Sequence, residues 1–63
     1  MRKEVPSPVI NYLRDQLLHR KELKQKAIQN TYNYWRATYK FMEEEFSEDK
    51  ALKLLQEVAD EIE

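Results

Sequence analysis

The chain contains no glycine, and its two prolines, Pro6 and Pro8, both lie close to the N-terminus. Tight hairpin turns and phosphate-binding loops depend on glycine, because only glycine adopts positive φ without a steric penalty. Proline is the strongest helix breaker, and none follows position 8. These absences predict an all-α protein and exclude P-loops, dinucleotide-binding loops and EF-hands.

The composition predicts one small folded domain. Of the 63 residues, 41% are apolar and seven are aromatic, which is more than a disordered chain usually carries. With 37% of residues charged, no apolar run is long enough to span a membrane. The lack of cysteine excludes disulfides and thiolate metal sites. We expect an extended arm at residues 1–7, a helical domain at 8–63, no cofactor, no metal and a cytoplasmic location.

A helix is predicted to begin at Pro8. The Ser7 hydroxyl can cap the free amides of the first turn, and proline at the first helical position loses no hydrogen bond. An apolar stripe with helical spacing follows. It consists of Ile10, Leu13 and Leu17, flanked by Val9 and Leu18. Residues 19–26 carry one apolar side chain, Leu23, and so have no core face.

The strongest pattern is a series of apolar residues spaced alternately by four and three, as in the seam of a coiled coil or helical bundle. The seam consists of Ile28, Tyr32, Trp35, Tyr39, Met42 and Phe46. A second set beside the seam widens the apolar face, so we expect this segment to pack against two neighbours. The second set consists of Ala27, Thr31, Tyr34, Thr38 and Phe41.

The apolar register changes after Phe46, which predicts a turn at residues 46–47 and a final helix over 48–62. Ser47 is placed to cap this helix. Its apolar stripe consists of Leu52, Leu55, Ala59 and Ile62.

Residues 8–46 permit two interpretations. As one helix they would extend about 58 Å. A break near residues 19–24 would instead divide the segment and give three helices. Because no glycine, proline or asparagine occurs there, we favour the long helix, which makes the chain a helical hairpin. A chain this small gains little stability from its own core, so we expect two copies to dimerise into an antiparallel helical bundle.

The two parts of the chain carry opposite charge. Residues 1–26 contain seven basic and three acidic residues, a net charge of +4, whereas residues 27–63 contain four basic and nine acidic residues, a net charge of −5. The basic part predicts a ridge that could contact nucleic-acid phosphates. This basic ridge consists of Arg14, Arg20, Lys21, Lys24 and Lys26. The alternative is that the two parts pair with each other, within one chain or across a dimer.

Three residues beside the seam are the best candidates for a protein-binding surface, because aromatic residues and arginine are enriched at interface centres. They are Tyr34, Arg36 and Phe41. Catalysis has little support, since His19 is the only histidine and so short a chain has difficulty enclosing a dry pocket. We therefore expect a non-enzymatic interaction or regulatory protein that acts as a homodimer on another macromolecule. The alternative is a nucleic-acid-binding accessory protein that uses the basic ridge.

Overall fold

The first helix of the chain, α1 (Ser7–Arg14), begins directly after Pro6. The structure is a computed structural model, and it describes residues 5–40, 44 and 46–62. The carbonyl of Pro6 accepts hydrogen bonds from the amides of Val9, at 3.0 Å, and Ile10, at 3.1 Å. Ser7 is already helical, so the predicted serine cap is wrong. The fixed backbone of Pro6 (φ −60°, ψ 146°) starts the helix instead.

The predicted long helix over residues 8–46 is wrong, and the alternative break near residues 19–24 is confirmed. After α1 the backbone widens into a π-helix, η1 (Asp15–His19). Just beyond the end of η1, the Glu22 amide donates a hydrogen bond of 2.8 Å back to the Gln16 carbonyl. Lys21 makes the reversal possible by adopting the left-handed region, with φ of 54°. This is the role that glycine usually has at a helix C-terminus.

The second helix, α2 (Lys24–Thr38), is shorter than the predicted seam. Tyr39 leaves the helix with extended backbone, φ −113° and ψ 101°, so the seam does not run through one helix to Phe46. Met42 and Phe41 lie outside the described residues. Between Lys24 and Thr38, the predicted spacing holds, and Ile28 is buried.

The third helix, α4 (Glu48–Ile62), confirms the predicted final helix and the turn at residues 46–47. The Ser47 hydroxyl accepts a hydrogen bond of 3.2 Å from the Lys50 amide. The Ser47 carbonyl also accepts one of 2.9 Å from the Ala51 amide. Ser47 is therefore the predicted N-cap of α4.

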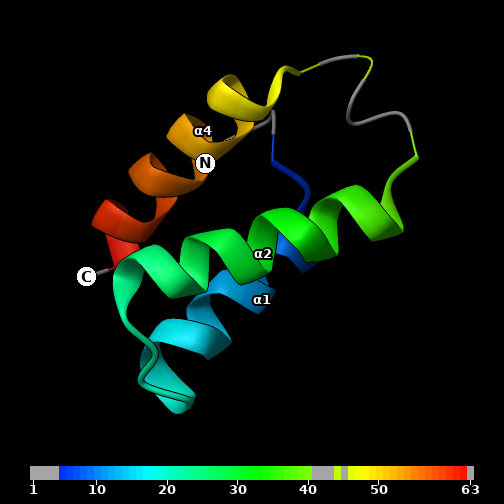
Figure 1. Ribbon diagram of the computed structural model, residues 1–63. Coiled ribbons are helices and arrows are strands. Elements are labelled where there is room, and N and C mark those ends of the chain that lie inside the picture. Colours follow the sequence, from blue (N-terminus) through cyan, green and yellow to red (C-terminus); the bar gives the residue numbers. More distant parts are fainter. Residues whose placement is uncertain (1–4, 41–43, 45, 63) are drawn as a thin grey trace.

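Figure 1 shows α2 and α4 running in opposite directions, and α1 contacts both of them. Helix α2 packs against both α1 and α4, as the width of its apolar face predicted. All three helices contribute side chains to one core. The core consists of Val5, Val9, Leu13, Ala27, Ile28, Tyr32, Trp35, Ala51, Leu55, Val58 and Ala59. The described residues thus form an all-helical fold of three helices.

One copy of the chain covers its own core. The radius of gyration is 10.5 Å, and a compact domain of this length has about 10.6 Å. Trp35 is 2% exposed and Leu55 is fully buried. Val5, in the predicted N-terminal arm, is also part of this core, and the boundary proposed at residue 7 stays a prediction. Within the described ranges, no helix has the length and apolar character that crossing a membrane requires.

Candidate docking groove between α1 and α4

Tyr34, which the sequence suggested as a partner-binding residue, packs inside the chain. It is half-buried, and its ring stacks on the ring of Tyr12 with centroids 4.4 Å apart. Arg36 lies exposed in the last turn of α2 and takes part in an interaction within the chain. Phe41 lies outside the described residues. A binding surface built from these three residues stays a prediction, and Tyr34 already has an aromatic partner.

The seam residues that the structure describes face this chain's own helices. Ile28, Tyr32 and Trp35 are buried, while Tyr39 and Phe46 pack half-buried against the core. Trp35 and Phe46 bring α2 and the start of α4 together, with ring centroids 5.5 Å apart and planes at 51°. This tilted arrangement is one of the geometries that aromatic pairs prefer.

The basic ridge is not a continuous helical face. Arg20 and Lys21 lie in the bend after η1, so Arg20 is not one helical turn from Lys24 as the sequence suggested. Arg20 pairs with Asp15 at 3.5 Å, and Lys26 pairs with Glu22 at 4.0 Å. Both contacts lie within residues 1–26, so they partly neutralise this side of the molecule without pairing it with the acidic part of the chain. Its binding to nucleic acid stays a prediction.

The oppositely charged parts of the chain meet where Lys24 pairs with Asp60. This contact joins the start of α2 to the last turns of α4. The hydrogen bond from Lys24 is the main cause that holds the pKa of Asp60 below its ordinary value of 3.8, with a smaller contribution from the Gln56 amide. The Asp60 side chain is 56% exposed, so the ion pair orients the two helices without being part of the core.

Asn30 and Gln16 make a polar contact between α2 and η1. The Asn30 amide donates a hydrogen bond of 3.0 Å to the side-chain oxygen of Gln16, which is 4% exposed. Thr31, fully buried on α2, donates its hydroxyl to the Ala27 carbonyl at 2.7 Å. Buried polar groups must be satisfied to be tolerated, and both side chains meet this requirement. The bond between Asn30 and Gln16 joins α2 to η1, whereas the bond of Thr31 lies within α2.

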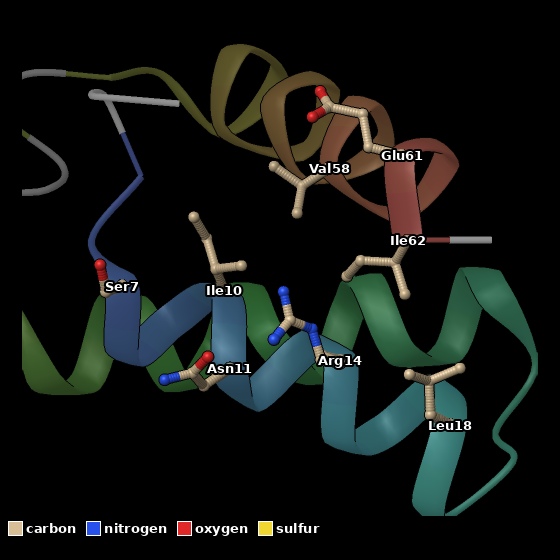
Figure 2. Close-up of a pocket in the computed structure, with 8 residues that line it drawn as sticks. All are labelled: Ser7, Ile10, Asn11, Arg14, Leu18, Val58, Glu61 and Ile62. Atoms are coloured by element: carbon tan, nitrogen blue, oxygen red, sulfur yellow. The ribbon is translucent and has the colours of Figure 1, made fainter. Parts of the chain in front are cut away.

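An open groove of about 510 Å³ lies between α1 and α4 (Figure 2). Its lining residues come from one face of α1 with the adjoining η1, and from the end of α4. They are Ser7, Ile10, Asn11, Arg14, Leu18, Val58, Glu61 and Ile62. Half of these side chains are apolar, and none of the lining residues belongs to α2.

The two charged groups of the groove, those of Arg14 and Glu61, point in different directions. In Figure 2 the Arg14 guanidinium lies between Ile10 and Ile62, while the Glu61 carboxylate points away from α1. Leu18 lies at one end of the groove and is 51% exposed, a large exposure for an aliphatic side chain. The groove therefore offers an apolar surface with a cation near its middle.

The described residues contain no cluster of three metal-binding side chains. His19 is exposed at the end of η1, and its nearest acidic neighbours in sequence, Asp15 and Glu22, are paired with Arg20 and Lys26.

Comparison with known proteins adds no relative: no family model, no curated protein and no solved structure matches the chain.

Sequence reasoning did not identify the groove, although one signal for it was present. The apolar face of α1 and η1 is wider than one contact needs, because Val9 and Leu13 are buried in the core while Ile10 and Leu18 line the groove. Which of these residues would line an open surface depended on where α4 packs. That position depends on the tertiary fold, including the bend at Lys21, which the sequence left open as the alternative break near residues 19–24.

Proposed function

We propose that this chain is a small non-enzymatic interaction protein that binds another protein through the groove between α1 and α4. The observation that supports the proposal is an open groove where exposed Leu18 lies beside the half-buried side chains of Ile10 and Ile62. Leu18 carries most weight, because its 51% exposure is not needed for the fold. An uncovered apolar surface bordered by polar groups is typical of protein interaction sites.

The shape of the groove supports a helical ligand. The wall formed by α1 and η1 runs from Ser7 to Leu18, which is roughly the length of three helical turns. A helix placed there would complete a four-helix arrangement with α1, α2 and α4. Binding of an amphipathic helix in an apolar groove is a common mode of peptide recognition.

Homodimerisation belongs to this proposal as the alternative occupant, a helix from a second copy. The sequence predicted a dimer because a core this small gives one chain little stability. Because one copy already covers that core, a dimer would form to cover the groove.

The test uses peptides selected from a displayed library of amphipathic helices on the folded full-length chain. Leu18→Lys should abolish binding of the selected peptides, measured by fluorescence anisotropy, while circular dichroism stays unchanged. Leu23→Lys is the matched control, because Leu23 is 79% exposed and lies outside the groove. Equal loss in both variants, or in neither, contradicts the proposal.

Sedimentation of the same variants tests the homodimer. A wild-type dimer that Leu18→Lys dissociates and Leu23→Lys preserves would identify a second copy as the occupant. A monomeric wild-type chain would contradict homodimerisation and leave the groove open for another protein.

A further inference from the structure

We propose that the groove accepts an amphipathic helix of a different protein that carries a carboxylate between two apolar residues, and that Arg14 selects this carboxylate. This inference rests on the proposed function and names the chemistry of the partner. It is carried by the position of one cation within an apolar groove.

Arg14 lies at the centre of an ordered series on the wall formed by α1 and η1. Ile10 lies about one turn of α1 before it, and Leu18, in η1, follows it by four residues, so one apolar side chain lies to either side of the guanidinium. Ile62 faces the same space from α4 (Figure 2). A helix lying in the groove would contact the apolar positions at its ends and place its middle over Arg14.

The charge of Arg14 is available to such a ligand. Among the described residues, the ion pairs of basic side chains involve Arg20, Lys24 and Lys26, and Arg14 is not one of them. Glu61, the acidic residue of the groove, directs its carboxylate away from α1. A bound helix would remove the guanidinium from water, and this is unfavourable unless the ligand supplies a negative charge. A carboxylate also matches the fork of donors on arginine.

The same position disfavours a second copy as the ligand. Where a two-fold axis passes through the groove, residues near the axis approach their own equivalents. Arg14 lies near the middle of the wall from Ser7 to Leu18, so two copies paired wall to wall in this way would bring like charges together. Like charges across an interface select against that pairing.

The probe is a displayed library of amphipathic helical peptides with two fixed leucines two turns apart and a randomised residue at the turn between them. Selection on the wild-type chain should enrich aspartate and glutamate at the randomised position. Selection on Arg14→Glu should enrich lysine and arginine instead. Lys53→Glu, which makes the same charge change at an exposed residue of α4 outside the groove, should retain the acidic preference.

The affinity of the best peptide gives a second measurement. Replacing its glutamate by glutamine should weaken binding to the wild-type chain about tenfold or more, and should have little effect on binding to Arg14→Gln. Arg14 is exposed, so both of its variants should keep the helical content of the wild type in circular dichroism.

Three results would overturn the inference. The first is selection of apolar peptides that need Leu18 but show no acidic preference, which leaves the proposed function intact. The second is an acidic preference that persists in Arg14→Glu, also with the proposed function intact. The third is the absence of any selected peptide that depends on Leu18, which rejects the inference and the proposed function together.

Discussion

Tyr12 of α1 and Tyr34 of α2 stack face to face, with ring centroids 4.4 Å apart and ring planes inclined by 6°. They are far apart in the sequence, and they meet because the chain reverses between η1 and α2. Stacking fixes α1 against α2 at a position beside the core. Tyr34 therefore holds α1 against α2, whereas the sequence pattern placed it beside the seam as a candidate binding residue.

The tyrosine stack should show energetic coupling. We expect a double-mutant cycle of Tyr12→Ala and Tyr34→Ala to give a coupling of about 0.5–1.5 kcal/mol in the free energy of unfolding. Urea unfolding followed by circular dichroism measures it. Tyr12→Ala combined with Asn33→Ala, an exposed neighbour of Tyr34, should be additive. Additivity in the tyrosine pair itself would contradict a stabilising stack.

Trp35 should be essential for folding. Its side chain is 2% exposed and contacts Phe46, so Trp35→Ala leaves a cavity and should cost about 3–5 kcal/mol. In so small a domain this loss should unfold most of the protein, measured as lost helicity at room temperature. Trp35→Phe keeps an aromatic ring and should be milder. A fully helical and soluble Trp35→Ala variant would show that this core is wrongly assigned.

Ser47 precedes α4 and Ser7 is the first residue of α1, and replacing them should have different effects on stability. Ser47→Ala removes the hydroxyl that caps α4 and should destabilise the protein by about 0.5–2 kcal/mol. Ser7→Ala is the matched control, since no side-chain hydrogen bond caps α1. Thermal unfolding of the two variants provides the comparison. A larger effect at Ser7 than at Ser47 would contradict the assigned caps.

The bend at Lys21 should be relieved by glycine. A residue with a Cβ pays about 1–2 kcal/mol in the left-handed region, whereas glycine does not. Glycine also gains entropy in the unfolded chain, which offsets part of this relief, so we expect Lys21→Gly to stabilise the protein by about 1 kcal/mol or less. Lys21→Ala retains the Cβ and should change the midpoint of urea unfolding little. Destabilisation by Lys21→Gly would contradict the positive φ.

The contact between Lys24 and Asp60 should make stability depend on acidic pH. The pKa of Asp60 is lowered mainly by its hydrogen bond from Lys24. A carboxyl group whose pKa is lower in the folded state stabilises the fold above its unfolded pKa, and this contribution is lost as pH falls through the folded pKa. An NMR titration should therefore find that Lys24→Gln raises the Asp60 pKa towards 3.8.

The control is Lys53→Gln, which removes one positive charge from α4 and leaves the hydrogen bond between Lys24 and Asp60 in place. It should keep the Asp60 titration close to that of the wild type. An Asp60 pKa that Lys24→Gln does not raise would show that the ion pair is not formed in solution.

Local sequence signals determined the helical class, the final helix and its cap. The absence of glycine and of later proline left no alternative to helices, and Ser47 with the change of apolar register marked where α4 begins. These features are encoded by neighbouring residues, because capping and helical periodicity act over a few positions. The apolar width of residues 27–38 likewise predicted that α2 would have two neighbours.

Tertiary packing decided where the first helical segment ends and which surface stays open. Lys21 is not a residue that favours positive φ, so the bend is stable only because the reversal buries Tyr32 and Trp35 of α2 against α1 and α4. The groove around Arg14 exists for the same reason. Its walls come from the two ends of the chain, and only the fold brings α1 and α4 close enough to form it.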